Sequence, residues 1–369
     1  MLKKCRLKNF KRFLAQEFEL NHLNLLSGMN GMGKSSVIQS FLLLRQSHQQ
    51  KLLKATGLAL NGDLIQIGTA QDALHNEAQQ DTIGFEITLD SQESIKWSFD
   101  YNSQSDVLSL SSPPVSNKTW NLSLFNDNFQ YLRAERLGPR SSFMMSDFQV
   151  RQHRQLGTQG EYTAHYLSIF GGSDKIAGPT LAHPNETSHN LLLQVEAWLG
   201  EISPGTRISL NATPEMDLVN LQFSFSGGTK YRSTNVGFGI TYTLPIIVAI
   251  LAAKPGALLL IENPEAHLHP KGQAQMGELL ARAASIGIQV IVETHSDHVL
   301  NGIRLAVHGG RLKPDHVALH FFQPQITPNT PAVVSPKLDR NGRIDQWPDG
   351  FFDEWDKSLD ALLEPAVGE

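Results

Sequence analysis

Apolar and polar positions alternate at the start of the chain and then change to a longer period. Residues 2–10 and 15–20 have polar residues between apolar ones, Leu7 and Phe10 in the first and Phe18 and Leu20 in the second, which predicts two short strands. Residues 22–26 are mostly apolar and end in Ser27-Gly28, as in a buried strand that enters a turn. Residues 35–46 have apolar side chains three and four positions apart, the spacing of one helix face. The N-terminal part therefore predicts three strands followed by a helix.

The middle of the chain returns to strict alternation. Residues 81–124 predict an antiparallel meander, with Asn, Ser and Pro between the alternating stretches, and residues 129–134 predict one more strand. Residues 141–215 are mixed, with helices predicted near 162–170 and 190–199. No heptad repeat runs through this stretch, so we expect no long coiled-coil arm.

After Gly239 the pattern changes to helices alternating with strands. The two strands are almost wholly apolar, as buried parallel strands are, and such alternation is typical of an α/β sheet. Residues 341–363 predict an amphipathic helix near the C-terminus. In order, the predicted elements are a helix over 240–253, a strand over 257–261, a helix over 271–284, a strand over 288–292 and a helix over 297–307.

These patterns divide the chain of 369 residues into four predicted parts. We expect an N-terminal lobe with the phosphate-binding loop described below and the meander over residues 1–135, and a helical and loop insertion over 136–215. A C-terminal lobe follows over 216–325, and an accessory segment over 326–369.

Composition narrows the function classes. Lys and Arg number 31 against 36 Asp and Glu, so the formal net charge of −5 excludes a polybasic nucleic-acid binder. The single cysteine, Cys5, excludes an intrachain disulfide and a cysteine-based zinc site. The longest apolar run, residues 244–253, is shorter than the ~20 residues of a membrane span. No signal peptide is visible, so we expect a cytoplasmic protein. The basic side chains within residues 2–10 favour an edge strand protected by charge over a phosphate site.

The segment from Gly28 to Ser35 has the pattern G-x-x-x-x-G-K-S between the predicted buried strand and the predicted helix. Backbone N–H groups of such a loop surround phosphate, and the start of the helix adds its positive end. The Lys34 side chain can reach the β- and γ-phosphates, and the Ser35 hydroxyl can bind Mg²⁺. We therefore predict a site for ATP and Mg²⁺ whose nucleotide-binding residues are Asn30, Gly31, Gly33, Lys34, Ser35 and Ser36.

The acidic end of the strand over residues 257–261 is a second candidate feature. Glu262 follows this strand where P-loop proteins place the carboxylate of the Mg²⁺ shell, so we predict that Glu262 shares the metal with Ser35. The neighbouring Asn263 cannot act as a base, which leaves Glu265 to orient an attacking water. The alternative is that Glu265 only caps the turn that follows.

Closely spaced histidines follow both buried strands. His267 and His269 lack the acid at position 271, here Lys271, that a hydrolase metal motif of the H-x-H-x-D-H kind requires. His295 follows the second strand at the same edge of the sheet as Glu262. From there its ring can hydrogen-bond a γ-phosphate, and we favour this third catalytic role over a metal site.

Taken in order, these motifs resemble those of the ABC/SMC-type ATPases, in particular the small prokaryotic branch near the overcoming-lysogenisation-defect ATPases. Pro264–Pro270 reads PEAHLHP and Thr294–Ser296 reads THS, as in that branch. Residues 347–353 resemble a C-terminal domain of unknown function found in one subfamily. The resemblance implies an α/β fold, a P-loop NTPase head of the ABC type, with a mixed sheet flanked by helices and an antiparallel β subdomain.

In such ATPases, two heads enclose ATP between the P-loop of one and a signature segment of the other. That segment falls on residues 236–239, so Gly237 and Gly239 are expected to contact the partner's nucleotide. The family's signature serine corresponds to Gly237 and its catalytic glutamate to Asn263, which implies ATP binding with slow hydrolysis. The resemblance also implies a homodimer formed on ATP. It further implies a separately encoded effector, such as a nuclease, in antiviral defence or DNA maintenance.

Two other interpretations stay open. Asn263 and Gly237 also suit a nucleotide-gated sensor or scaffold with little turnover. Arg133, Arg136 and Arg140 could meet phosphate or a partner, or could form local ion pairs at a solvated strand end. Together with the basic first strand they allow a nucleic-acid-binding head, for which steep salt dependence would be the mark.

Overall fold

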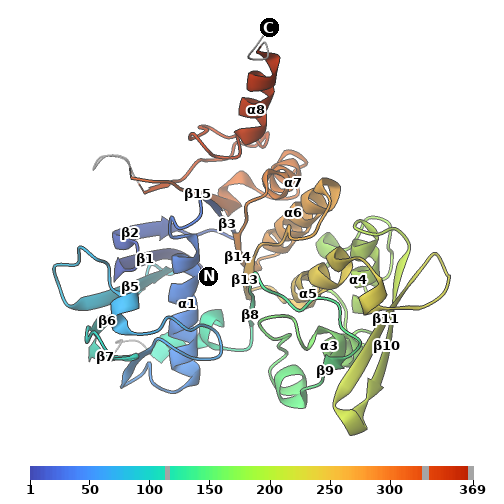
Figure 1. Ribbon diagram of the computed structural model, residues 1–369, viewed down its shortest axis with the longest axis horizontal. Coiled ribbons are helices and arrows are strands. Elements are labelled where there is room, and N and C mark those ends of the chain that lie inside the picture. Colours follow the sequence, from blue (N-terminus) through green and yellow to red (C-terminus); the bar gives the residue numbers. More distant parts are fainter. Residues whose placement is uncertain (113–116, 326–331, 365–369) are drawn as a thin grey trace.

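The computed structural model describes residues 1–112, 117–325 and 332–364. Residues 113–116 of the predicted meander, and residues 326–331 and 365–369 of the predicted accessory segment, lie outside the described residues. Figure 1 shows a central sheet with an antiparallel sheet and helix α1 (Lys34–Gln49) on one side and a mixed helical and β region on the other. The predicted α/β class is confirmed, and the four-part division of the chain stays a prediction.

The central sheet carries the strands that the sequence pattern marks as apolar. Their side chains are almost all buried, and among the described strands only β16 runs antiparallel to its neighbour. The carboxyl ends of the parallel strands therefore meet at one edge, which holds Gly28, Glu262 and Glu293. The strand order is β16 (Val333–Val334), β15 (Val317–Phe322), β3 (Leu23–Gly28), β14 (Gln289–Glu293), β13 (Leu258–Glu262) and β8 (Phe129–Leu132).

The antiparallel sheet confirms the two N-terminal strands and most of the meander, with two corrections. Strand β1 lies between β2 and β5, so it is not the edge strand that its basic residues suggested. These charges are paired instead: Lys4 lies 2.8 Å from Glu17 on β2, and Lys3 lies 3.6 Å from Asp90. Residues 117–125 form short 3₁₀ turns where the meander was expected to continue. The strand order is β2 (Phe13–Glu19), β1 (Leu2–Phe10), β5 (Thr82–Leu89), β6 (Ser94–Asp100), β7 (Val107–Ser112) and β4 (Gly57–Ala59).

Helix α1 fills the space between the two six-stranded sheets. Its buried Phe41 belongs to one apolar cluster with Leu7 of β1 and Leu260 of β13. A second cluster joins the opposite face of the central sheet to helices whose positions the sequence predicted. These helices are α5 (Phe238–Ala252), α6 (Pro270–Ser285) and α7 (Asp297–His308). Helix α6 begins at Pro270, a residue type favoured in the first turn. Helix α7 begins after Ser296, whose hydroxyl accepts a hydrogen bond from the Val299 N–H.

A smaller β region packs beside helices α3 (Thr163–Phe170) and α4 (Leu191–Gly200), which the sequence predicted. Its main part is a hairpin of β10 (Thr206–Thr213) and β11 (Leu218–Phe225), which the sequence analysis missed. Short strands β9 (Phe143–Met144) and β12 (Tyr231–Arg232) pair with β11. The longest helices of the described chain, α1 and α6, have 16 residues each, so this region carries no long coiled-coil arm.

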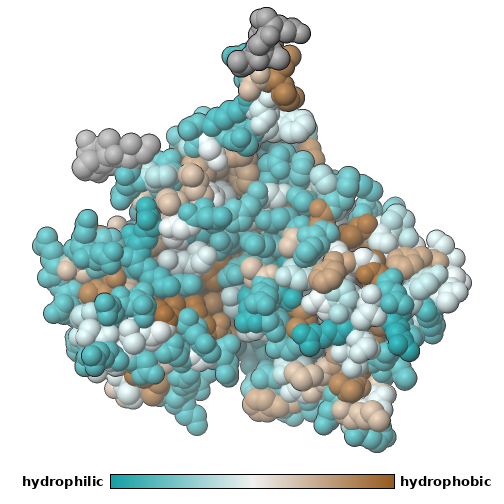
Figure 2. All heavy atoms as spheres, viewed as in Figure 1, coloured by the Kyte–Doolittle hydropathy of each residue, from teal (hydrophilic) through white to brown (hydrophobic). Residues whose placement is uncertain are grey.

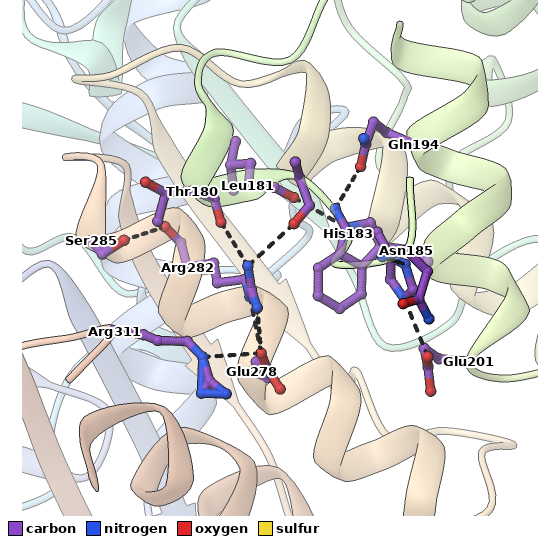
Figure 3. Close-up of polar contacts among 12 residues, drawn as sticks. Thr180, Leu181, His183, Asn185, Gln194, Glu201, Glu278, Arg282, Ser285 and Arg311 are labelled. Atoms are coloured by element: carbon purple, nitrogen blue, oxygen red, sulfur yellow. Dashed lines mark hydrogen bonds and ion pairs between the residues drawn. The ribbon is translucent and has the colours of Figure 1, made fainter. Parts of the chain in front are cut away.

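Residues 178–183 are fixed against α6 by a compact polar network (Figure 3). Arg282 of α6 donates to the carbonyl oxygen of Thr180 at 3.0 Å and pairs with Glu278 at 2.7 Å. The backbone N–H of His183 donates to a glutamine side chain of α4 at 2.7 Å. The Arg282–Glu278 pair is partly buried and the His183 bond is buried, so this network holds the segment between α4 and α6.

Of the helix predicted over residues 341–363, only the last part is helical, as α8 (Glu354–Leu363), while residues 341–353 form turns and loops. Helix α8 projects away from the rest of the chain (Figure 1). Trp355, Leu362 and Leu363 are exposed, and Figure 2 shows apolar atoms on this projection above a mostly hydrophilic face. Phe351, just before the helix, is fully buried. Within the described ranges, every helix is too short or too polar to cross a membrane.

Candidate functional site

The loop between β3 and α1 lines a cavity of about 590 Å³ at the edge of the central sheet. Gly28 has a φ of 126°, and a Cβ atom there would lie 2.1 Å from the carbonyl oxygen of Phe322, so only glycine fits beside β15. Gly33 has a φ of 105°, and its Cβ would lie 2.6 Å from the ring of Phe13. All six predicted nucleotide-binding residues line this cavity: Asn30, Gly31, Gly33, Lys34, Ser35 and Ser36.

Lys34 occupies the wall of this cavity with little solvent exposure. Its ammonium donates to the carbonyl oxygens of Gly28 at 2.8 Å and Met29 at 2.9 Å. Burial lowers the pKa of Lys34, and the charge of Glu293 acts in the opposite direction. The cation is therefore held on the loop itself, within the space that a phosphate group would enter.

Glu293 is a functional candidate that the sequence analysis did not select. The Ser35 hydroxyl donates to its carboxylate, with oxygen–oxygen distances of 3.1 and 3.3 Å. Burial and, to a lesser extent, the charge of Glu262 raise the pKa of Glu293 to about 7, while Lys34 and Ser35 act in the opposite direction. The signal was present in the sequence, because Glu293 follows an apolar strand just as Glu262 does.

Glu262 lies beside Glu293 in the register of β13 and β14. Its carboxylate accepts hydrogen bonds from the Tyr131 hydroxyl and the Ala134 N–H, both at 3.0 Å. Burial raises the pKa of Glu262, and these two bonds act in the opposite direction. The structure thus brings Ser35 and Glu262 to the same edge of the sheet, but the hydroxyl of Ser35 bonds to Glu293.

The loop that follows β13 fixes the segment that carries His295. The Glu265 carboxylate accepts from the Thr294 hydroxyl at 2.7 Å and from the His295 N–H at 2.8 Å. Both oxygens of Glu265 are therefore engaged with this segment, which brings two of the predicted catalytic residues together. His295 is exposed on one side. The part of its ring that is covered and, to a lesser extent, the charge of Lys34 lower its pKa.

Asn263 begins this loop in a left-handed conformation with a φ of 45°. Asparagine tolerates this region better than glutamate, because its short amide can bond locally to the backbone. The Asn263 N–H donates to the carbonyl oxygen of Glu293 at 2.8 Å. The local backbone therefore favours asparagine at the position where the family pattern has a carboxylate.

Gly237 and Gly239, the predicted signature residues, are at the start of α5. Neither is among the residues that line the cavity of the P-loop. A Cβ atom at Gly239 would lie 2.7 Å from the carbonyl oxygen of His267, so the loop after β13 packs on the first turn of the helix. Phe238 between the two glycines is 53% exposed. The signature segment therefore presents an open surface instead of closing its own phosphate site.

Two basic residues that the sequence analysis did not assign also line the cavity. Lys11 and Arg12 occupy the turn between β1 and β2. Burial lowers the pKa of Lys11, and the charge of Asp72 opposes this effect. The pair adds positive charge to the lining of the cavity. The sequence signal was the Lys-Arg pair between two predicted strands.

The oxygen atoms at this edge suit Mg²⁺. In the described part of the chain, no group of three or more His, Cys, Asp or Glu side chains could hold a metal ion. Ser35 and Glu293 supply a hydroxyl and a carboxylate, and Mg²⁺ in nucleotide sites takes its other ligands from water and phosphate. These residues therefore fit a magnesium ion that enters with its nucleotide.

Two family models match separate parts of this chain. A family model described as "AAA domain, putative AbiEii toxin, Type IV TA system" matches residues 23–301, and a model for a protein of unknown function, DUF3696, matches residues 312–362. None of the curated proteins matches the sequence.

Two solved structures share the fold. An SMC head bound to the C-winged helix domain of ScpA is 13% identical with a TM-score of 0.51, over 91% of this chain and 98% of that chain. An Smc head with an extended coiled coil, bound to the C-terminal domain of ScpA from Pyrococcus furiosus, is 13% identical with a TM-score of 0.51, over 98% of this chain and 99% of that chain. At this identity the likeness shows the fold alone. The family match and the shared fold confirm the predicted P-loop head, and the match over residues 312–362 confirms the predicted C-terminal domain of unknown function.

Proposed function

Because this chain belongs to the AAA-domain family whose model spans residues 23–301, we propose that it binds Mg²⁺–ATP, hydrolyses it slowly and closes on a second copy of itself around the nucleotide. Membership of a P-loop ATPase family implies nucleotide use, whereas the slow rate and the dimer are our proposal. The observation that carries it is the 590 Å³ cavity, where the six P-loop residues and Glu293 face one space. Glycines, a lysine and a hydroxyl at this spacing suit the phosphates of a nucleotide and its Mg²⁺.

The residues of the cavity have separate tasks in this proposal. Backbone N–H groups of the loop and the start of α1 hold the phosphates, and Lys34 moves from the carbonyl oxygens of Gly28 and Met29 to the β- and γ-phosphates. The Ser35 hydroxyl would hold Mg²⁺. Glu262 is the carboxylate that the sequence predicts beside the metal, and Glu293 is the carboxylate to which the Ser35 hydroxyl donates in this structure. When bound, Mg²⁺ neutralises charge that develops on the phosphates.

The slow rate follows from the chemistry of the loop after β13. Asn263 carries a neutral amide where a base would act. Both oxygens of Glu265 accept bonds from Thr294 and His295, so we assign Glu265 the task of holding His295 toward the γ-phosphate. Glu262 is likewise held in place by the donors Tyr131 and Ala134, which favour its ionised form.

The dimer and its partner rest on exposed surface and on analogy. Gly237 and Gly239 lie at an open helix start that can meet the nucleotide of a second copy. The two similar Smc heads are bound to domains of ScpA, and by analogy we propose that this chain controls a separately encoded effector protein in antiviral defence or DNA maintenance.

The first experiment measures mass by light scattering with and without Mg²⁺–ATP, and phosphate release in the same samples. We expect a shift to dimer with slow release for the wild type, and loss of nucleotide binding in Lys34→Ala. Unchanged binding in Lys34→Ala would contradict the proposal. Ser91→Ala, on an exposed turn, is the control and should behave as the wild type.

A second candidate function is a nucleotide-gated sensor with little turnover, and Asn263 favours it. A shift to dimer without phosphate release would support this sensor over the ATPase. A nucleic-acid-binding head has less support, because Lys3 and Lys4 of the basic strand are already paired with Asp90 and Glu17.

A further inference from the structure

Arg136 is a buried cation held by backbone carbonyls. It is 4% exposed, and its guanidinium donates to the carbonyl oxygens of Glu262 at 2.6 Å and Asn263 at 2.7 Å, at the end of β13. The same group donates to the carbonyl oxygen of Tyr242 on α5 at 3.1 Å and of Arg133 at 2.9 Å. Arg136 therefore meets neither a phosphate site nor a solvated ion pair, which were the two roles expected for the arginine cluster.

Tyr242 completes this connection from the side of α5. Its ring lies 4.6 Å from the Arg136 guanidinium, and its hydroxyl donates to the carbonyl oxygen of Ala134 at 2.8 Å. The Arg136 N–H in turn donates to the Tyr242 hydroxyl at 3.0 Å. The segment after β8 and the helix α5 are thus joined by bonds in both directions, over a stacked cation and ring.

The start of α5 is also in contact with the loop after β13. The rings of Tyr242 and His267 are 4.8 Å apart, and Gly239 packs under the His267 carbonyl. The same loop reaches the segment that carries His295 through the bond from the His295 N–H to the Glu265 carboxylate. One short stretch of chain therefore contacts the nucleotide edge at one end and the signature segment at the other.

Burying the Arg136 cation costs desolvation energy, which its four carbonyl acceptors offset. Burial lowers the pKa of Arg136 to about 10, and a buried cation needs several good acceptors to be tolerated. A planar guanidinium can supply donors to three separate elements at once, whereas a lysine ammonium supplies them from one point. The site is thus specific for arginine.

We infer that Arg136 is a positioning residue that ties the nucleotide-side end of β13 to the first turns of α5. Through this tie, a change at the P-loop of one copy moves the signature segment that this copy presents to its partner. The inference rests on the proposed function, because it assigns a role in ATP-dependent dimerisation.

The test compares Arg136→Lys and Arg136→Gln with the matched variant Arg140→Gln, an exposed arginine on the same segment. We expect nucleotide affinity of the single chain to stay within about threefold of wild type in all three. In the two Arg136 variants the ATP concentration that gives half-maximal dimer rises about tenfold, and the ATP concentration for half-maximal turnover rises with it, within the range of measured couplings. Arg140→Gln behaves as wild type. A merely structural role would lower affinity, dimer and turnover together.

An unchanged ATP concentration for half-maximal dimer in both Arg136 variants would overturn the inference. If these variants do not fold, Tyr242→Phe tests the same tie, because it keeps the ring and removes the hydroxyl; we then expect a rise of about threefold in the same half-maximal concentration. A wild-type response from Tyr242→Phe would also overturn the inference. Failure of the proposed function is separate: the wild-type chain itself would then bind no ATP or form no dimer, and both ideas would fall.

Discussion

Glu262 and Glu293 end neighbouring strands in the same register, yet their surroundings differ. Glu262 accepts two hydrogen bonds from the segment after β8, one from a tyrosine and one from the backbone. Glu293 faces the P-loop and shares the hydroxyl of Ser35. The hydrogen-bond donors of Glu262 thus come from its own sheet and the segment after β8, whereas Glu293 lines the cavity of the P-loop. The role of an acid at the end of a strand can therefore be judged only together with the groups that donate hydrogen bonds to it.

This difference divides the proposed roles. The pKa of Glu293 rises to about 7 because it is buried and lies near a second carboxylate, which a bound cation would relieve. The two donors of Glu262 already relieve part of that cost. We therefore propose Glu293 as the carboxylate nearest to Mg²⁺, and Glu262 as the group that fixes β8 to β13.

The strongest way to break this comparison is Glu293→Gln. Removing the carboxylate beside Ser35 should lower ATP turnover by about 100-fold, the effect of losing an electrostatic group in a phosphoryl-transfer site. Phosphate release at saturating Mg²⁺–ATP measures it. Glu86→Gln, on the surface of the antiparallel sheet, is the control and should keep the wild-type rate. Equal turnover in Glu293→Gln and wild type would assign the metal to Glu262.

Glu262→Gln should act mainly on stability. An amide nitrogen would face the Ala134 N–H or the Tyr131 hydroxyl, so one buried donor loses its acceptor. We expect the free energy of unfolding to fall by about 2 kcal/mol. Chemical denaturation of the nucleotide-free protein measures it. A loss of turnover without any loss of stability would show that Glu262 acts on the nucleotide.

The raised pKa of Glu293 predicts a pH dependence in the metal-free protein. Between pH about 4.5 and about 7 the folded state binds more protons at this group than the unfolded state, so the stabilisation is present at low pH and is lost as pH rises. We expect the difference in unfolding free energy between wild type and Glu293→Gln to change by about 1–2 kcal/mol over this range. Denaturation in EDTA at several pH values measures it. Parallel curves would contradict the shifted pKa.

Tyr131→Phe should give the smallest effect. It removes one of the two donors to Glu262 and keeps the ring, at a cost of about 1 kcal/mol in unfolding free energy. Combined with Glu262→Gln, the two losses should not add, because both remove the same bond. Additive losses in denaturation curves would mean that Tyr131 stabilises the fold without Glu262.

The sequence predicted the elements whose periodicity is strong. The apolar stretches 257–261 and 288–292 and the helices around them appear where expected, because a buried strand or amphipathic helix needs that pattern. The hairpin over 206–225 was missed although residues 218–225 alternate clearly. The edge assignment of β1 failed for another reason: pairing order depends on β5, a strand distant in sequence.

The site was partly predictable for the same reasons. The P-loop has a local motif, so its six residues could be named in advance, and the structure places them around one cavity. Glu293 carries the same local signal as Glu262, but which of the two meets Ser35 depends on how β14 inserts between β3 and β13. Arg136 could not be assigned, because its partners are backbone carbonyls, and any residue type has those.

Strand β15 makes the boundary between the two matched families a poor place to cut the chain. The second family begins at residue 312, but β15 pairs with β3, and the Phe322 carbonyl sits where a side chain at Gly28 would have to go. The region of unknown function thus supplies one wall of the phosphate loop. The two families match separate stretches of the sequence, yet a strand of the second lies in the same sheet as the P-loop strand, so a cut near residue 312 would remove the β15 strand that packs on Gly28.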